Sequence, residues 1–272
     1  MKISIITATY NSAKTLQDTI DSVLSQDYPL FEHIIVDGNS KDGTVEIIRR
    51  NASRYKSGQL KWISEPDKGI YDAMNKGISM TTGDVVGLLN SDDFYASDNI
   101  LSTIASAMDG NNDVDAVYGD VCYVKSSDTS KLVRHYSSRY FRRFNMHFGF
   151  MPAHPSFYCR KQVYEQHRIA EGEYFDTSYK VASDFEFLVR TIYVSRIRTI
   201  YIYKDFVRMR VGGASSSGLS SYKAIFSDLL RALKQNRVYS NSLMLLMRYP
   251  FKILDLIVGR FLGHLQNPVL KN

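Results

Sequence analysis

The sequence predicts an α/β fold with a mostly parallel central sheet, helices on both faces of that sheet, and a helical extension at the C-terminus. In the first half of the 272 residues, short β-branched runs alternate with segments whose apolar residues recur at helical spacing. Strands that alternate with helices of this length form parallel sheets covered on both sides. In addition, 44% of the residues are hydrophobic and 23% are charged, which is typical of a globular protein. This composition excludes collagen, low-complexity disorder and a disulfide-dense mini-protein.

The elements of the first half follow in chain order. The predicted strands are residues 2–8, 33–37, 60–64 and 84–89. The predicted helices between them are residues 15–25, 44–55 and 70–80. The first helix illustrates the pattern, because its apolar residues Leu16, Ile20, Val23 and Leu24 have helical spacing.

The second half is less regular. Residues 115–124 are a predicted strand, and residues 131–135 are expected to pair with it. Residues 136–151 are rich in aromatic residues and Arg without a clean period. A helix over 184–193, a strand over 198–203, a flexible Gly- and Ser-rich loop over 212–218 and helical structure from Leu219 onward complete the prediction.

Two cysteines and the N-terminal residues bear on the compartment. Cys122 and Cys159 form no metal-type pair, and no signal peptide or run of about 18 uninterrupted apolar residues is recognised. We therefore expect a reduced cytoplasmic chain in which both thiols pack in the interior, with one disulfide as the alternative.

Polar side chains follow each of the four predicted strands of the first half. They lie in residues 7–11, 37–44, 65–69 and 90–93. Because ligands bind at the carboxyl ends of strands in an open parallel sheet, these residues predict a cleft there. Carboxylates in three of the four segments suit a cation and the hydroxyls of a ribose.

The adjacent carboxylates Asp92 and Asp93 are the strongest candidates for a metal site. Hard cations such as Mg²⁺ or Mn²⁺ prefer oxygen ligands and often bind one or two carboxylates together with substrate phosphates. The alternative is a turn or a helix N-cap, which Asn, Ser and Asp also favour. The G-x-G-x-x-G and G-x-x-x-x-G-K-[ST] patterns are missing after the first strand, which disfavours a hydride-transfer cofactor and a P-loop.

Four ordered motifs resemble those of the family-2 glycosyltransferases of the GT-A fold, inverting enzymes that build bacterial polysaccharides. They are IITATYN (5–11), IVDGNSKDGT (35–44), DKGIYDAMNKG (67–77) and GD…LNSDD (83–93). The resemblance continues more weakly through HPSF (154–157), ASDFE (182–186) and GGAS (212–215). It covers about residues 1–218 and implies a nucleotide-sugar-binding half over 1–125, an acceptor-side half over 126–218 and a helical extension over 219–272.

The resemblance implies a donor site for a nucleoside-diphosphate sugar and a divalent cation, Mg²⁺ or Mn²⁺. Thr7, Thr9 and Asn11 would line the nucleotide site, Asp37 would bind the base or ribose, and Asp67 and Lys68 would lie beside the base and phosphates. Asn90, Ser91, Asp92 and Asp93 would be the family's DxD element, with Asn in its first place. Asp93 would be the principal metal ligand, and Asp92 would face the ribose or the metal.

The resemblance also implies a catalytic base at the start of a helix, where Asp184 follows Ser183 instead of the family's Glu. Glu186 is the competitor, although residues two apart do not share a helix face. His154 is a candidate contact to the donor sugar or the acceptor, with a structural histidine as the alternative. Some members carry a metal-ligating His before the late Gly-rich loop, which this chain lacks. Arg208 or Arg210 are expected at the diphosphate instead, or on a solvated strand.

The net charge of +6 arises in the tail, where residues 229–272 hold seven basic residues and one acid. Between residues 247 and 265, Arg248, Lys252, Asp255, Arg260 and His264 form a narrow polar stripe on an otherwise apolar helical pattern. This pattern predicts a helix in an anionic membrane surface, with packing on the body or a homodimer interface as the alternative. A nucleic-acid partner is not expected, because no motif accompanies the Tyr- and Arg-rich residues 136–144. Those residues instead suit an acceptor loop.

Together these inferences predict metal-assisted, inverting transfer of a sugar to a hydroxyl of a growing, lipid-linked bacterial surface glycan. A UDP-sugar donor is favoured over a GDP- or dTDP-sugar, and the enzyme is expected at the inner face of the cell membrane. The alternatives are a sugar nucleotidyltransferase, disfavoured because a basic Gly-rich first loop is missing, and a non-catalytic sugar-nucleotide or glycan-binding module.

Overall fold

A single curled sheet organises the computed structural model, which describes residues 1–111, 113–212 and 219–250. Its strand order is β3-β2-β1-β4-β8-β6-β9-β5, and β7 pairs with β6 outside this path. The first four strands are β1 (Ile3–Thr9), β2 (Phe31–Asp37), β3 (Leu60–Ser64) and β4 (Val85–Leu88). They pair in parallel, as predicted, with β1 between β2 and β4 and with β3 outside β2.

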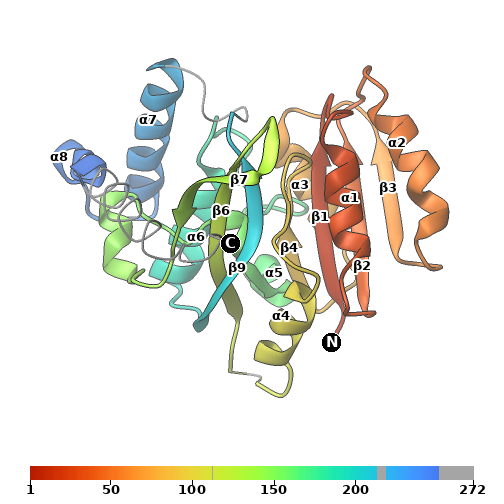
Figure 1. Cartoon of the computed structure of the whole chain (residues 1–272). Helices are drawn as coiled ribbons and strands as arrows, with labels where there is room; N and C mark the ends of the chain where they lie inside the picture. The colour runs from red at the N-terminus through yellow and green to blue at the C-terminus, as the bar shows by residue number, and fades with distance from the viewer. Residues whose placement is uncertain (112, 213–218, 251–272) are drawn as a thin grey trace, which may run out of the picture.

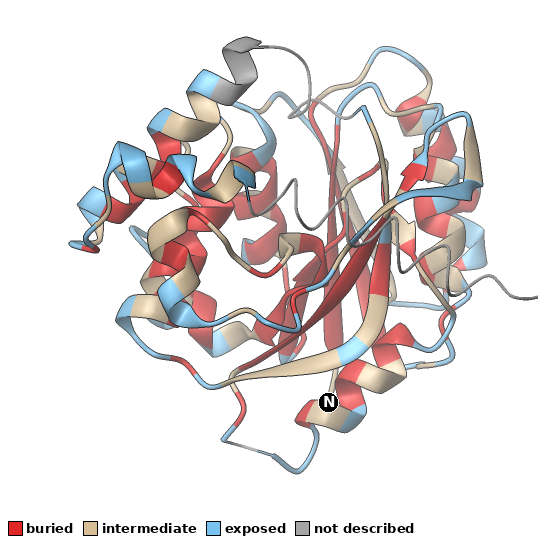
Figure 2. Cartoon of the chain, turned by 60° about the vertical axis from the view of Figure 1, so that its left-hand side comes forward, coloured by how far each residue is buried: buried red, intermediate tan, exposed pale blue. Residues whose placement is uncertain are grey.

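The two central strands are hydrophobic because both faces of the sheet are covered. Every residue of β1 and β2 is buried. One core, on the face of the sheet covered by α3 (Ile70–Ser79), contains Ile6, Ile34 and Met74. The opposite core contains Ile5, Ile35 and the apolar faces of α1 (Leu16–Leu24), α2 (Thr44–Asn51) and α4 (Ile100–Met108). Figure 2 shows these buried residues along the strands and the inner sides of the helices.

The second half of the sheet is mixed. Its strands are β5 (Phe94–Tyr95), β6 (Ala116–Lys125), β7 (Asp128–Tyr136), β8 (Tyr158–Arg160) and β9 (Thr199–Arg210). β9 runs parallel to β6, whereas β7 and β8 run antiparallel to it. β8 also pairs antiparallel with β4 and so joins the two halves. Gly87 permits this junction, since a Cβ atom there would lie 2.0 Å from the ring of Tyr158.

Several boundaries differ from the sequence prediction. α2 ends at Asn51, and a 3₁₀ turn, η1 (Ala52–Arg54), follows it. β9 was predicted to stop at residue 203, but it continues to Arg210, because its pairing with β6 tolerates irregular register around Asp205. The predicted helix over 184–193 is α6 (Ser183–Leu188) followed by one wide π-helical segment, η4 (Val189–Val194).

The remaining elements pack on the second half of the sheet and on one another. They are η2 (Arg143–Phe148), η3 (His154–Ser156), α5 (Lys161–Gln166), α7 (Leu219–Gln235) and α8 (Ser242–Leu246). α7 confirms the helix expected from Leu219, and Asn241 caps α8 by accepting a 2.9 Å hydrogen bond from the Met244 amide. Most of the predicted loop over 212–218 and of the amphipathic segment over 247–265 lies outside the described residues. In the part that is described, no helix is both long and apolar enough to cross a bilayer.

Candidate functional site

At the carboxyl ends of β1, β2 and β3, two predicted site residues, Thr9 and Asp37, lie side by side with Ser64. Thr9 lies opposite Asp37, and Asp37 lies opposite Ser64. The fully buried Asp37 carboxylate accepts hydrogen bonds from the Ser40 hydroxyl at 2.5 Å, the Ser40 amide at 3.0 Å and the Ser64 hydroxyl at 2.7 Å. The sequence did not single out Ser40 or Ser64 as its partners. These contacts fix the carboxylate at the strand ends.

The loops after β1, β2 and β3 contact one another. Asn11, at a φ of 49°, donates its amide to the Ser40 hydroxyl and accepts the Lys41 amide at 2.9 Å. Asp67 accepts the Gly69 amide at 2.8 Å, and a Cβ atom on Gly38 would lie 2.4 Å from its carboxylate. Glycine at position 38 thus leaves room for the Asp67 carboxylate to lie against this loop. Lys68 is exposed beside them.

Thr7 and Thr9, two predicted nucleotide contacts, differ in their surroundings. The Thr7 hydroxyl is buried, donates to the Leu89 carbonyl at 2.8 Å and lies 2.9 Å from Nε2 of His33. Its hydrogen-bonding capacity is used inside the sheet. The Thr9 hydroxyl is also buried, yet it has no hydrogen-bond partner among the described residues. Buried hydroxyl groups are normally paired, so Thr9 is the one with capacity left for a ligand.

Asp93 is a carboxylate in an environment that favours a cation. It is 1% exposed, and its Oδ2 accepts a 3.3 Å hydrogen bond from the Asn90 side-chain amide. Burial and the neighbouring charge of Asp92 raise the pKa of the Asp93 carboxyl well above its ordinary value, against the lowering effects of Asn90 and Arg210. Two carboxylates with so little compensation fit a divalent cation, which would supply the missing positive charge.

Arg210 connects the end of β9 to this acidic pair. Its guanidinium donates to the Asp92 carbonyl at 2.6 Å, pairs with Asp18 of α1 and stacks 4.9 Å from the ring centroid of Phe94. Its side chain is only 7% exposed. Arg208, the other predicted arginine, is exposed two residues earlier on the same strand. The two arginines thus occupy different environments.

Asp184 and Glu186, the competing candidates for the base, have different partners. Asp184 lies in the first turn of α6, and its Oδ1 accepts a 3.3 Å hydrogen bond from the Tyr71 hydroxyl. Burial, followed by the charge of Asp184, raises the pKa of the Tyr71 phenol. Glu186 is 2% exposed and forms a two-pronged ion pair with Arg190 at 3.0 and 2.9 Å. A carboxylate held in such a pair is engaged in the packing of its own helix.

His154 lies in η3, which packs against β4, the strand that precedes the acidic pair. Burial lowers the pKa of its imidazole, while the charges of Asp184 and Asp92 act in the opposite direction. Both carboxylates are therefore close enough to affect the same ring. Its Nδ1 is buried without a hydrogen-bond partner among the described residues, as is the hydroxyl of Ser183. Thr9, His154 and Ser183 each carry a buried polar atom without a hydrogen-bond partner among the described residues, and all three belong to segments that the sequence resemblance associates with the cleft.

Two features of the structure escaped the sequence prediction. Tyr71 was quoted only as part of a motif, although its hydroxyl contacts Asp184. The second is a group of possible metal ligands, Cys122, His135 and Asp205, whose ligand atoms all lie within 4.8 Å of one another. No spacing in the sequence signalled this group, which does not include Asp92 or Asp93. Both cysteines are buried free thiols, as expected.

The sequence and the fold are similar to those of known glycosyltransferases. Residues 4–166 match the sequence profile of the family described as Glycosyl transferase family 2. An uncharacterized glycosyltransferase of Mycobacterium tuberculosis is 29% identical over 242 residues, which cover 87% of this chain and 85% of the relative. A PGL/p-HBAD biosynthesis glycosyltransferase of Mycobacterium bovis is 36% identical over 118 residues, which cover 43% of this chain and 46% of that relative.

Two solved structures share the fold. Residues 1–349 of S. aureus TarS in complex with UDP-GlcNAc give a TM-score of 0.66 at 20% identity, covering 86% of this chain and 66% of that one. The mannosyltransferase PcManGT of Pyrobaculum calidifontis, in complex with GDP-Man and Mn²⁺, gives a TM-score of 0.64 at 18% identity, covering 98% of this chain and 76% of that one. The predicted α/β architecture is therefore confirmed as the GT-A fold. The family profile spans more than half of the sequence, and the chain belongs to glycosyltransferase family 2.

Proposed function

We propose that this chain transfers a sugar, with inversion, from a nucleoside-diphosphate sugar to a hydroxyl of a lipid-linked glycan. The observation that carries the proposal is the buried Asp93 carboxylate beside Asp92, just after β4, against which η3 with His154 packs. The acidic pair suits a diphosphate with its cation, and Asp184, whose charge also acts on His154, suits deprotonation of an acceptor. A transferase needs a donor site and an acceptor site held together.

The donor half of the proposal rests on the ends of the parallel strands. The fixed Asp37 carboxylate suits a ribose or base, and the unpaired Thr9 hydroxyl suits a further contact. Asn11, Asp67 and Lys68 line the adjoining loops. A UDP-sugar is the favoured donor and a GDP-sugar the alternative, since TarS was solved with UDP-GlcNAc and PcManGT with GDP-Man.

The cation is assigned to Asp93 and Asp92. The buried, poorly compensated Asp93 carboxylate fits such a ligand, and Mn²⁺ accompanies GDP-Man in PcManGT. Mg²⁺ or Mn²⁺, when bound, would stabilise the negative charge of the departing nucleoside diphosphate. Arg210 holds the Asp92 backbone and contributes positive charge on the same side.

The acceptor half of the proposal rests on Asp184. Inverting transfer needs a base that removes the proton of the attacking hydroxyl on the face opposite the leaving group. Asp184 is assigned this role because Tyr71 alone contacts its Oδ1 in the described structure, whereas Glu186 is paired with Arg190. His154 is assigned to the sugar that lies between the two carboxylate sites.

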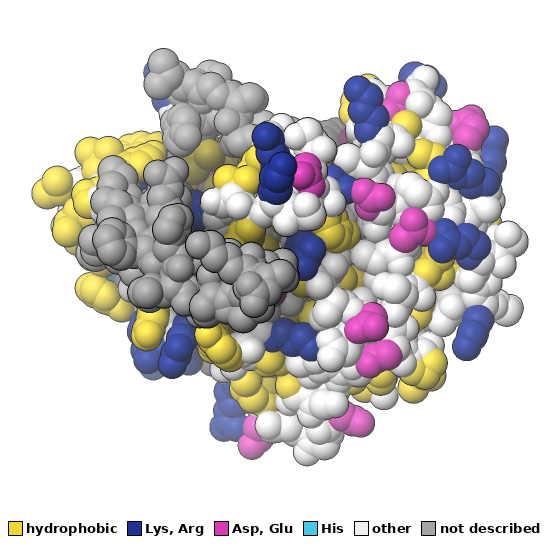
Figure 3. Space-filling model, viewed as in Figure 1, with side chains coloured by type: hydrophobic (Ala, Val, Ile, Leu, Met, Phe, Trp, Pro, Cys, Tyr) yellow, Lys and Arg dark blue, Asp and Glu magenta, His cyan; other side chains and the backbone are white. Residues whose placement is uncertain are grey.

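The membrane is the proposed location of the acceptor. The apolar tip, which we define as Phe144, Leu243, Leu246 and Met247, has exposed fractions between 43% and 70%. It joins η2 to α8, which pack together, and the exposed Arg142 and Arg143 flank it. Figure 3 shows hydrophobic side chains at the left edge of the molecule, where α7 and α8 lie in Figure 1. Apolar side chains flanked by Arg favour an anionic membrane surface at the cytoplasmic face.

A donor panel with matched variants tests the activity. Donor turnover is measured with UDP-, GDP- and dTDP-sugars, with and without Mn²⁺, using a lipid-linked glycan extract as acceptor. Asp93→Asn and Asp184→Asn are each expected to lose activity by about a hundredfold or more. The exposed Asp98→Asn and Asp113→Asn are the controls and keep full activity. Donor binding without turnover for any sugar would instead identify a binding module.

A vesicle assay tests the location separately. Full-length protein carrying Leu243→Asp and Leu246→Asp is expected to sediment less with anionic vesicles than the unaltered chain. Leu30→Asp, which changes an equally exposed leucine in the loop before β2, is the control. Equal sedimentation of all three proteins would show that the apolar tip does not contact the membrane.

A further inference from the structure

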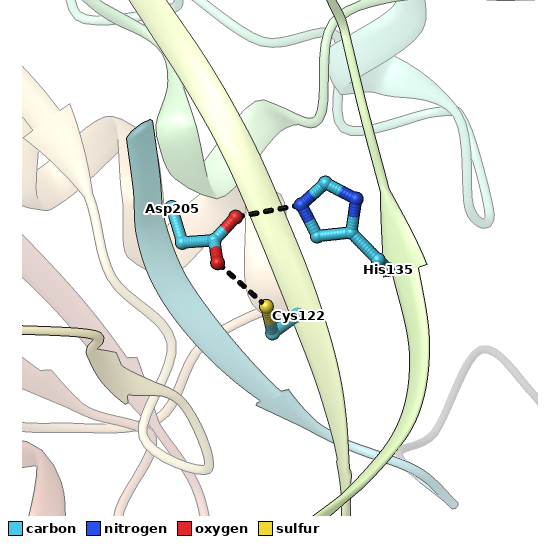
Figure 4. Close-up of side chains that lie close together, drawn as sticks. All are labelled: Cys122, His135 and Asp205. Carbon is cyan, nitrogen blue, oxygen red and sulfur yellow. Dashed lines mark hydrogen bonds and ion pairs between the residues drawn. The ribbon is translucent and has the colours of Figure 1, made fainter. Parts of the chain in front are cut away.

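Three strands bring a thiol, an imidazole and a carboxylate together away from the acidic pair. Cys122 lies on β6 opposite His135 on β7, and Asp205 lies on β9. The Cys122 thiol donates to Oδ2 of Asp205 at 3.1 Å, and Oδ1 of the same carboxylate lies 2.7 Å from Nε2 of His135. Figure 4 shows all three side chains directed toward one point between the strands.

An irregularity in the sheet produces this arrangement. Between the pairs Tyr118–Tyr201 and Asp120–Asp205, β9 contains two more residues than β6 does. Extra residues in one strand bend it and redirect its side chains. Gly119 makes the bend possible, because a Cβ atom there would lie 2.5 Å from the Phe206 ring and 2.6 Å from the Lys204 carbonyl. Asp205 is thereby directed to Cys122.

The donor set is selective for one kind of metal. Sulfur and imidazole nitrogen suit Zn²⁺, whereas Mg²⁺ and Mn²⁺ prefer oxygen alone. Three protein ligands leave one position of a tetrahedral zinc site for water or an anion. Cys122 and Asp205 also line a cavity of about 450 Å³, together with Ser97, Ser130 and Arg208, which gives that position access to solvent.

We propose that Cys122, His135 and Asp205 form a zinc-binding site that is separate from the proposed cation site at Asp92 and Asp93. The surroundings of the group support the separation. Neither Asp92 nor Asp93 is among the residues that line the cavity shared by Cys122 and Asp205. Neither of them belongs to the group of ligand atoms that lie within 4.8 Å of one another. Zinc there would tie β6, β7 and β9 together without using the donor site.

A zinc titration of the full-length, metal-stripped protein tests the proposal. We expect one equivalent of Zn²⁺ to bind and to raise the melting temperature. Replacement of zinc by Co²⁺ is expected to give a thiolate-to-metal charge-transfer band. Cys122→Ser should abolish that band and weaken zinc binding by about tenfold or more. His135→Gln changes a half-exposed side chain, so it tests the same site with little risk to folding.

Two controls separate this site from others. Cys159→Ala removes the other buried thiol and should keep the band. The double variant Asp92→Asn, Asp93→Asn should also keep it, so the result does not depend on the proposed transferase activity. A band that is absent from the unaltered protein, or that survives in Cys122→Ser, would overturn the proposal and leave the three residues as a hydrogen-bonded group.

Discussion

The Tyr71 hydroxyl donates a 3.3 Å hydrogen bond to Oδ1 of Asp184, joining α3 to the first turn of α6 across 113 residues of sequence. Tyr71 is 8% exposed, so its ring is held by the core while its hydroxyl orients the carboxylate. If Asp184 is the base, Tyr71 positions it without touching the substrate.

Tyr71→Phe is therefore expected to lower kcat with little change in the donor KM. A hydrogen bond to a charged group contributes about 1.5–3 kcal/mol, which corresponds to a loss of roughly tenfold to a hundredfold. Steady-state kinetics with varied donor and acceptor measure the change. Tyr203→Phe, at an exposed tyrosine of β9, is the control and should behave as the unaltered enzyme. A pure rise in donor KM would contradict the positioning role.

Asp93→Asn is expected to remove activity while stabilising the metal-free fold. The buried carboxylate is costly, because burial and Asp92 both disfavour its charge. An amide of the same shape removes that cost, and we expect the free energy of unfolding to rise by about 1 kcal/mol. Urea denaturation in the presence of a chelator measures it. A less stable variant would show that the Asp93 charge supports the fold.

Arg210→Lys is expected to weaken donor use because a lysine cannot reach Asp92 and Asp18 together. The planar guanidinium makes both contacts and stacks on Phe94. The ammonium group of lysine is a single point of charge and cannot donate in two fixed directions from one plane. We expect kcat/KM for the donor to fall about tenfold, the cost of one charge-assisted hydrogen bond. Arg208→Lys, at the exposed arginine of the same strand, is the matched control. Equal effects of the two substitutions would argue against a specific role for Arg210.

The buried His33 side chain is expected to make the folded protein less stable in mild acid. It is fully buried between the Thr7 and Tyr55 hydroxyls, and burial lowers its pKa from 6.5 to about 3. Below pH 6.5 the unfolded chain therefore binds a proton at His33 that the folded chain does not bind. Proton binding then favours the unfolded chain, and the free energy of unfolding decreases as the pH falls toward 3. Between pH 6 and 4 the slope from this residue is about 1.4 kcal/mol per pH unit.

The difference between two proteins isolates this slope. His33→Gln keeps a side chain able to hydrogen bond but does not titrate. Its free energy of unfolding should depend less steeply on pH between 6 and 4 than that of the unaltered chain. Parallel curves for the two proteins would show that His33 is protonated in the folded state.

The first half of the fold was predictable because each of its strands can be recognised from its own short stretch of sequence. The strands β1 to β4 are continuous apolar runs with motifs at their ends, and the structure confirms both these strands and the parallel pairing that the sequence predicts. The strands β5 and β8 have only two and three residues, so they are defined by their partners and not by their own pattern. β9 was shortened in the prediction because Lys204 and Asp205 interrupt its apolar pattern, and only the register with β6 explains them.

The candidate site divides in the same way. The sequence identified the acidic pair and Asp184, and their roles remain predictions. It did not identify Tyr71 as a partner of Asp184, since that contact depends on how α3 and α6 pack. The group of Cys122, His135 and Asp205 spans 83 residues and arises from a bend in one strand, which no spacing rule encodes.

β9 carries Asp205 at its bend and Arg210 at its end, five residues apart on one continuous strand. Side chains alternate between faces, so inserting or deleting one residue between these positions would turn Arg210 away from Asp92 while leaving Asp205 in place. We therefore expect relatives of this chain to have no insertions or deletions within residues 206–209. A designer who wishes to graft a new acceptor loop should cut beyond Arg210, where the spacing of the strand no longer sets the geometry of either group.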